Sequence, residues 1–223
     1  MNVHRVAVVL AGVGIAAPAT SHAAEAPSCT ARAPVSAEAI CPLLPGTKSP
    51  DVQLRTLTGA ATSLVAALDG KPAVVIFYRG GWCPFCNVQL GALQSIEPEL
   101  AKLGVRVIGV SPDRPEKLQE SIGKHQLTFT LLSDSSMCAA QAFGVAFKVD
   151  DATIERYRAM KLDLEGDSGE KHHLLPVPSV FVVDPDGTIR FSYVNPNYKV
   201  RLDPQLLLAA ARSPAWSVPL KKP

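Results

Sequence analysis

Fully apolar runs alternate with amphipathic segments along most of the chain. Residues 73–78 and 105–110 are almost entirely apolar and rich in β-branched side chains, which is typical of strands buried on both faces of a sheet. Between them, residues 84–103 carry apolar side chains at helical spacing, with Pro98 expected to kink or restart the helix. The pattern predicts parallel strands joined by covering helices.

The remaining segments continue this alternation. Further elements are expected as an edge strand at 52–57, a helical turn at 62–68, helices at 115–126, 135–143 and 203–212, and a strand at 129–132. The turn sequence Asp184-Pro-Asp-Gly187 lies between strand candidates 179–183 and 188–193 and predicts a hairpin. The charged stretch 150–176 is interpreted as an insertion, helical near 154–161. The sequence therefore predicts a three-layer α/β/α sandwich with a mixed central sheet.

The N-terminal 23 residues have the pattern of a secretory signal peptide. A cationic start at His4 and Arg5 precedes an apolar run, and Ser21-His22-Ala23 provides a small-x-small cleavage site. The run of about a dozen residues is shorter than the roughly 20 that span a bilayer. We expect cleavage near Ala23 and a periplasmic or secreted protein without stable membrane insertion. An uncleaved anchor is the alternative.

Composition limits the class of protein. The chain has 223 residues, of which 47% are hydrophobic and 19% charged, so it contains enough apolar material for a packed core. Its formal net charge of +2 gives no indication of nucleic-acid binding or of a polybasic membrane anchor. One domain is expected at residues 50–212, after a Pro/Ala-rich lead-in at 24–49 and before a tail at 213–223.

All five cysteines lie after the predicted signal peptide. Disulfides form and persist in the compartments to which exported proteins travel. Cys29 and Cys41 flank part of the lead-in and are a candidate structural disulfide. If Cys83 pairs with Cys86, Cys138 remains as either a buried residue or a candidate resolving thiol.

Cys83 and Cys86 form a C-x-x-C motif between a predicted buried strand and a predicted helix. The first N–H groups of a helix are unpaired and its dipole is positive there, so this position stabilises a thiolate. Arg79 adds a positive charge, Pro84 stiffens the turn, and Trp82 is expected to form a wall of the site. The motif therefore indicates a redox-active dithiol. The structural alternative is a disulfide without redox activity. A four-sulfur zinc site is not expected, because the sequence has no second C-x-x-C motif.

Trp82-Cys83-Pro84-Phe85-Cys86 resembles the active-site pentapeptide of thioredoxin-fold proteins, and residues 77–90 resemble the peroxiredoxin-like branch of the AhpC/TSA family. The other matching stretches are Ser111-Pro-Asp113, Leu132-Ser-Asp134, Phe143-Gly-Val145 and the hairpin turn. The resemblance covers about residues 50–212. It implies a thioredoxin fold, thiol-based antioxidant activity without a metal or other cofactor, and a thioredoxin-like reductant as redox partner.

The resemblance leaves the attacking thiol open. In thioredoxin-like proteins the first cysteine attacks, which is Cys83 here. In peroxiredoxins a Thr or Ser stands three residues before the peroxidatic cysteine, and this register points to Cys86. Peroxiredoxins also have an Arg where this chain has Pro178, and a proline there resembles the cis-proline of thioredoxins. Without that Arg, a peroxide has lost one source of positive charge that polarises its O–O bond, whereas disulfide exchange needs only a thiolate and a leaving group.

Three hypotheses follow. The first is a peroxiredoxin-like oxidoreductase that reduces hydroperoxides, disulfides or both through a reversible Cys83–Cys86 disulfide. The second is a periplasmic disulfide reductase of thioredoxin type without peroxidase activity. The third is a copper-binding module that combines the dithiol with His172 or His173 of the insertion. For Tyr198 and Arg201, after the hairpin, a salt-bridged surface is the preferred interpretation, and packing over the site is the alternative.

Overall fold

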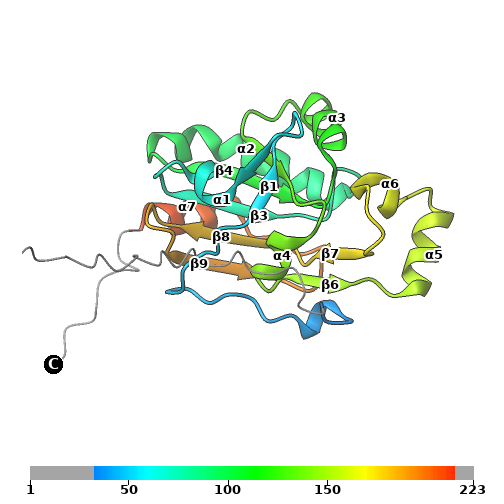
Figure 1. Ribbon diagram of the computed structural model, residues 1–223. Coiled ribbons are helices and arrows are strands. Elements are labelled where there is room, and N and C mark those ends of the chain that lie inside the picture. Colours follow the sequence, from blue (N-terminus) through cyan, green and yellow to red (C-terminus); the bar gives the residue numbers. More distant parts are fainter. Residues whose placement is uncertain (1–32, 214–223) are drawn as a thin grey trace, which may run out of the picture.

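A mixed sheet of seven strands organises the computed structural model, which describes residues 33–213 (Figure 1). Its strand order is β2-β1-β5-β4-β3-β8-β9, with β3–β4 and β4–β5 parallel and the other pairs antiparallel. The strands are β1 (Gln53–Arg55), β2 (Ala61–Ser63), β3 (Ala73–Phe77), β4 (Arg106–Ser111), β5 (Thr130–Ser133), β8 (Ser179–Val183) and β9 (Ile189–Val194). The predicted mixed sheet and its terminal hairpin are confirmed.

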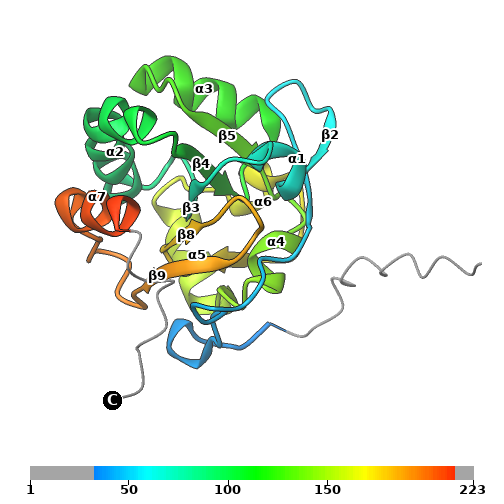
Figure 2. The same ribbon diagram turned by 90° about the vertical axis from the view of Figure 1, so that its left-hand side faces the viewer.

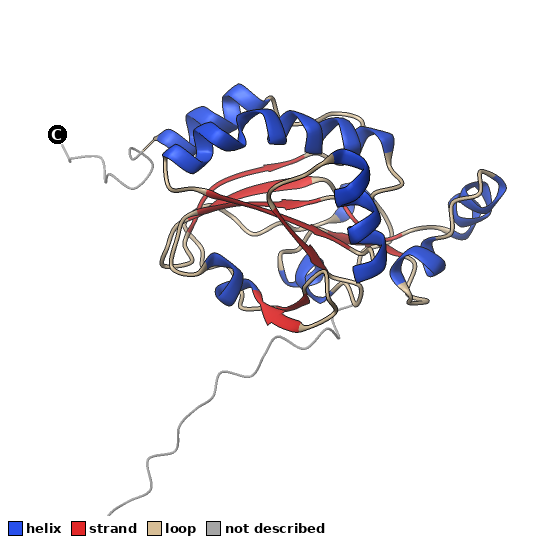
Figure 3. Cartoon of the chain, turned by 90° about the horizontal axis from the view of Figure 1, so that it is seen from above, coloured by secondary structure: helices blue, strands red, loops and turns tan. Residues whose placement is uncertain are grey.

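Helices cover both faces of this sheet (Figures 2 and 3). One face is covered by α2 (Pro84–Lys102), α3 (Pro115–His125) and α7 (Pro204–Arg212). The opposite face is covered by α1 (Leu64–Leu68) and α4 (Cys138–Ala142). The predicted three-layer sandwich is therefore confirmed, and within residues 33–213 no helix has the length and apolarity required to cross a bilayer.

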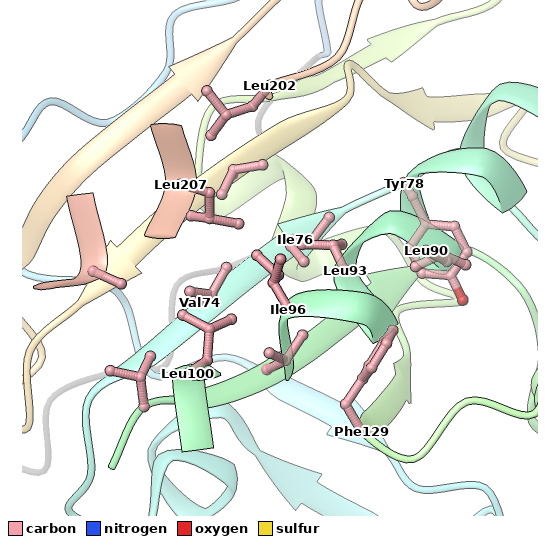
Figure 4. Close-up of a cluster of buried hydrophobic side chains, with 14 of the residues drawn as sticks. Val74, Ile76, Tyr78, Leu90, Leu93, Ile96, Leu100, Phe129, Leu202 and Leu207 are labelled. Atoms are coloured by element: carbon pink, nitrogen blue, oxygen red, sulfur yellow. The ribbon is translucent and has the colours of Figure 1, made fainter. Parts of the chain in front are cut away.

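Strand β3 lies at the centre of both hydrophobic layers. Val74 and Ile76 pack with α2 on one face, whereas Val75 and Phe77 pack with α1 and α4 on the other. All four are at most 1% exposed, which explains why this strand is apolar at every position. Figure 4 shows the α2 side, where side chains of β3 meet those of α2 and α7. The carboxyl end of β3 is thereby held firmly, and the C-x-x-C motif follows it directly.

Several details of the predicted helices and strands were wrong. Strand β1 is not an edge strand, because β2 pairs outside it, and β2 occupies the start of the predicted helical turn at 62–68. Pro98 lies inside one continuous helix α2, so the helix does not restart there. The insertion 150–176 has more regular structure than a single helix: α5 (Asp151–Ala159), α6 (Leu164–Ser168) and β7 (Leu174–Pro176). Strand β7 pairs with β6 (Ala146–Lys148), which the sequence pattern did not reveal because both strands are only three residues long. Helix α5 stands away from the sheet (Figures 1 and 3).

The described part of the lead-in is attached to the domain along its length. It contains a short 3-10 helix, η1 (Ala37–Ala39). Backbone hydrogen bonds join Lys148 N–H to Pro34 O, Leu43 N–H to Phe143 O, and Gly46 N–H to Ile189 O. Residues 33–49 therefore form part of the folded domain. The predicted signal peptide and nearly all of the predicted tail lie outside the described residues.

The packing on the α4 side of the sheet can be tested at its cluster of three phenylalanine rings. Phe143 is fully buried, and its ring centroid lies 4.9 Å from that of Phe77 and 5.0 Å from that of Phe181. Because Phe143→Ala leaves a cavity between these rings, we expect it to lower the free energy of unfolding by roughly 3–5 kcal/mol in urea titrations. Val88→Ala, at a position 74% exposed, is the matched control and should change it little. A loss at Phe143 no greater than at Val88 would contradict this packing.

Candidate active site

The turn between β3 and α2 depends on two glycines. Gly80 has a φ of +141°, a backbone conformation that side chains with a Cβ rarely adopt, and a Cβ there would collide with the Trp82 ring. A Cβ on Gly81 would collide with Ser121 of α3. The chain can therefore pass closely beneath Trp82 and α3 and enter α2 at Cys83.

Asp113 holds this turn from the neighbouring strand. It follows β4, which runs parallel to β3, so both strand ends meet at one edge of the sheet. Its Oδ2 accepts a hydrogen bond of 2.7 Å from the Gly81 N–H. Asp113 is 1% exposed, and this burial raises the pKa of its carboxyl to about 7. The Ser111-Pro-Asp113 motif thus contributes a buried carboxyl that fixes the backbone just before Cys83.

Cys83 is the N-cap residue of α2, and Pro84 occupies its first helical position. The Cys83 carbonyl accepts backbone hydrogen bonds from Cys86 (3.0 Å) and Asn87 (3.1 Å). Both cysteines are free thiols in this structure, and they are 1% and 0% exposed. The structure therefore brings the predicted pair together at a helix N-terminus, with both sulfurs covered.

The two sulfurs have opposite protonation tendencies. The pKa of Cys83 is lowered to about 6, chiefly by a hydrogen bond from the Cys86 side chain, with smaller contributions from the Cys86 backbone and the charges of Arg79 and Arg201; burial opposes the shift. The pKa of Cys86 is raised well above its ordinary value, first by burial and then by its hydrogen bond with Cys83. Between these values the pair holds one proton, which resides on Cys86, and the negative charge resides on Cys83.

Arg201 reaches this pair from the loop between β9 and α7. Its Nη2 donates to the Cys86 Sγ at 3.4 Å, and its Nη1 donates to the Gln89 Oε1 at 3.2 Å. The interpretation of Arg201 as part of a salt-bridged surface was therefore wrong. The alternative interpretation, that Arg201 packs over the site, is the one the structure supports, although the residue lies 115 positions from Cys86 and belongs to no motif that identifies this contact. Arg201 places a positive charge at the dithiol, although Pro178 occupies the position where an Arg was expected.

Arg79 is 4% exposed and surrounded by aromatic rings. Its guanidinium carbon lies 4.2 Å from the ring centroid of Tyr198, 5.0 Å from that of Trp82 and 5.7 Å from that of Tyr157. It also donates a hydrogen bond to the Tyr157 hydroxyl. Arg79 therefore packs with Trp82 and with Tyr198, for which packing over the site was the alternative interpretation, whereas the contribution of Tyr157 was missed. Tyr157 comes from the insertion, whose charged, weakly periodic sequence did not single it out.

Pro178 lies beside the site, but its peptide bond is trans, since residues 33–213 contain no cis peptide bond. The expected cis-proline is therefore wrong. The flanking backbone explains the geometry: Val177 N–H bonds to Val145 O at 2.8 Å, and Ser179 begins β8. Extended backbone on both sides is continued by a trans bond, which is also the lower-energy isomer. Pro178 still lines a cavity together with Arg79.

Cys41 and Cys138 do not lie at the Cys83–Cys86 site. Cys41 is an exposed free thiol, so the predicted Cys29–Cys41 disulfide is not formed; Cys29 lies outside the described residues. Cys138 is disulfide-bonded and therefore is not a free resolving thiol. It begins α4, which packs on the sheet face opposite to α2. This separation of layers explains why Cys138 does not approach the dithiol.

The two histidines of the insertion have local structural partners. His172 Nε2 lies 2.7 Å from Ser135 O, and its Nδ1 accepts the Leu174 N–H at 2.8 Å. His173 Nε2 lies 2.7 Å from Glu165 Oε1. Within residues 33–213, no group of three or more His, Cys, Asp or Glu side chains is placed to hold a metal ion. The geometry therefore gives the copper-binding hypothesis no support.

Known proteins resemble about half of this chain in sequence. The putative peroxiredoxin bcp of Haemophilus influenzae is 39% identical over 106 residues, which cover 47% of this chain and 66% of that protein. Peroxiredoxin Bcp of Escherichia coli K12 is 38% identical over 104 residues, with the same coverage. The matched region thus spans 66% of the length of either relative.

Solved structures and a family model extend the comparison. Peroxidoxin BcpB from Mycobacterium tuberculosis superposes with a TM-score of 0.59 at 22% identity, covering 75% of this chain and 96% of that one. Peroxiredoxin Q from Xanthomonas campestris gives 0.57 at 24% identity, covering 77% and 96%. These similarities show a thioredoxin-like fold of the peroxiredoxin kind. Residues 45–192 match the model of the AhpC/TSA family. Because this match covers more than half of the chain, the protein belongs to the AhpC/TSA family.

Proposed function

We propose that this protein is an exported thiol oxidoreductase that reduces hydroperoxides, disulfides or both by cycling Cys83 and Cys86 between dithiol and disulfide. The observation that carries the proposal is the proton shared between two buried sulfurs, which leaves a thiolate on Cys83 near neutral pH. The comparisons support the same chemistry, since the relatives that match about half of the chain are named peroxiredoxins.

Cys83 is the attacking sulfur in this proposal. Its thiolate attacks the distal oxygen of a hydroperoxide: the S–O bond forms, the O–O bond breaks, and the released alkoxide takes a proton from solvent. The sulfur is thereby oxidised to a sulfenic acid and the peroxide is reduced to an alcohol. Cys86 then attacks this sulfenic acid, so the S–S bond forms and the oxygen leaves as water with the Cys86 proton. A thioredoxin-like dithiol returns two electrons and two protons by disulfide exchange.

The two arginines have different roles in these steps. Arg79 contributes positive charge that stabilises the Cys83 thiolate, and Arg201 does so while also binding the Cys86 sulfur. Holding Cys86 at 3.4 Å from a cation favours loss of its proton when it attacks Cys83. Because both sulfurs are covered, a substrate gains access only when the surrounding loops move.

A disulfide reductase without peroxidase activity uses the same pair. Its first step is attack of the Cys83 thiolate on a substrate disulfide, which forms a mixed disulfide and releases one thiolate. Cys86 then displaces the second substrate thiolate and closes the Cys83–Cys86 bridge. The Cys83 thiolate favours disulfide reduction as much as peroxide reduction. The two activities therefore have to be separated by experiment.

The first prediction concerns the order in which the thiols react. In a Cys41→Ser background, which removes the exposed thiol, we expect iodoacetamide to modify Cys83 before Cys86. The rate at Cys83 should rise about tenfold per pH unit below its pKa of about 6 and level off above it, because only the thiolate reacts. Mass spectrometry of quenched samples locates each modification.

Matched arginine variants provide the control for this experiment. Arg201→Gln should move the Cys83 profile to higher pH, because it removes one of the charges that lower this pKa. Arg212→Gln should leave the profile in place, because Arg212 pairs with Glu99 on the surface. Modification of Cys86 before Cys83 would overturn the assignment of the attacking sulfur.

The second prediction separates the two activities and the two cysteines. Stopped-flow fluorescence should show oxidation of the reduced protein by hydrogen peroxide, and turbidity should report its reduction of insulin disulfides. Cys83→Ser should lower both rates roughly 100-fold or more, because the attacking thiolate is absent. Cys86→Ser should retain the first peroxide step and accumulate a sulfenic acid on Cys83 that dimedone traps. Insulin reduction with a peroxide rate no higher than that of Cys83→Ser would establish the reductase alternative instead.

The third prediction concerns export. The full chain, expressed in a Gram-negative host, should be recovered from the periplasmic fraction with an N-terminus near Ala24. This expectation rests on the charged, apolar and small-x-small pattern of residues 1–23, which lie outside the described residues. Replacing Leu10 with Arg interrupts the apolar run and should leave the unprocessed chain in the cytoplasm. An intact N-terminus on the unaltered chain would contradict the signal-peptide proposal.

A further inference from the structure

A cavity of about 260 Å³ lies beside Arg79. Its walls come from five parts of the chain: the lead-in around η1, the turn after β3 with Arg79, the β6–α5 segment, the end of β7 with Pro178, and the loop after β9. The lead-in runs beneath β6 (Figure 1), where Lys148 N–H bonds to Pro34 O. The wall at residues 35–38 precedes residue 45, at which the match to the family begins. This cavity is therefore built in part by segments outside the family match.

Arg79 is the buried charge of this cavity. The other charged residues of the lining, Glu38, Lys148 and Asp150, are exposed. Within the described residues no carboxylate lies within ion-pair distance of Arg79; its contacts are the Tyr157 hydroxyl and three aromatic rings. A buried cation without an anionic partner is costly, and buried charges in proteins are generally paired. The lining thus offers a favourable position for a negative group.

The Cys83 thiolate supplies that negative charge only while the pair is reduced. Its attraction to Arg79 is one of the causes that lower the Cys83 pKa. Protonation of Cys83 or formation of the disulfide removes the charge, whereas Arg79 stays charged throughout. In those states the cation faces the cavity without an anion from the protein.

The other lining residues indicate which kind of ligand the cavity would hold. Val35, Phe147 and Pro196 contribute apolar surface, with the Tyr198 ring beside them. The Tyr157 hydroxyl accepts its hydrogen bond from Arg79 and keeps its own proton to donate. A guanidinium and a phenol in a cavity that also has apolar wall residues match a carboxylate attached to an apolar body. The volume suits a small molecule better than a segment of another protein.

We infer that this cavity binds a small carboxylic acid with an apolar body, whose carboxylate lies against the Arg79 guanidinium and the Tyr157 hydroxyl. The site is coupled to the dithiol because the carboxylate and the Cys83 thiolate compete for the same cation. Each therefore weakens the other by the same factor, as thermodynamic linkage requires. Binding of the acid in this way does not depend on the proposed reaction.

Calorimetric titration of the reduced mature chain with hexanoate, hexan-1-ol and inorganic phosphate tests the inference. We expect hexanoate to bind roughly tenfold more tightly than hexan-1-ol, because only hexanoate pairs with Arg79. Phosphate, which has no apolar body, should give no heat of binding. Tyr157→Phe should weaken hexanoate binding several-fold, whereas Lys71→Gln, an exposed cation outside the lining, should not. Equal binding of hexanoate and hexan-1-ol, or no binding of either, would overturn the inference.

A second measurement needs no variant of the cavity. Saturating hexanoate should lower the iodoacetamide rate at Cys83 roughly threefold at pH 6, because it draws the Arg79 charge away from the thiolate. Conversely, Cys83→Ser at pH 8 should bind hexanoate several-fold more tightly than the unaltered reduced protein. An unchanged Cys83 rate under saturating hexanoate would refute the coupling. Failure of the peroxide and insulin assays would refute the proposed function alone, since hexanoate binding is read separately.

Discussion

Two sulfurs that share one proton in a nearly dry environment are the interaction on which the rest of this site depends. Burial disfavours a thiolate, so the charge on Cys83 is maintained only because several groups stabilise it together. The Cys86 side chain donates a hydrogen bond, the N-terminus of α2 adds its unpaired N–H groups, and Arg79 and Arg201 add positive charge. These groups come from segments far apart in the chain. The thiolate is therefore a property of the folded domain, and the C-x-x-C motif alone does not create it.

Local patterns were sufficient to predict the layer that positions the dithiol. Strand β3 and helix α2 have strong and different periodicities, and each packs as its pattern requires. The spacing of Cys83 and Cys86, together with the strand–helix boundary, then determines where the sulfurs lie. The features that the sequence did not reveal depend on long-range contacts. Arg201 reaches Cys86 across 115 positions, and Tyr157 reaches Arg79 across 78. Neither position has a local pattern that distinguishes it from a surface residue.

The wrong predictions share a related cause. The cis-proline and the Cys29–Cys41 disulfide were inferred from a sequence position or from proximity along the chain. In the folded chain the peptide bond before Pro178 is trans, Cys41 is a free, exposed thiol, and Cys138 of α4 is disulfide-bonded. The lead-in illustrates the same point, because its Pro/Ala-rich sequence placed it outside the predicted domain, yet its backbone hydrogen bonds attach it beside β6 and β9. There it helps to enclose the surroundings of Arg79.

The shared proton also determines how the redox couple responds to pH. Formation of the dithiol from the disulfide takes up two electrons and, below the Cys83 pKa of about 6, two protons. Above that value only Cys86 keeps its proton, so reduction takes up one proton and the reduction potential falls less steeply with pH.

The Cys83 thiolate has a lowered pKa in the folded state, so its contribution to stability is fully present only above its unfolded pKa and disappears as pH falls through about 6. Asp113 acts in the opposite sense, because its pKa is raised to about 7 and its ionisation lowers stability as pH rises towards that value. The turn that carries Cys83 is bound to Asp113 through the Gly81 N–H, so the two titrations act on the same few residues.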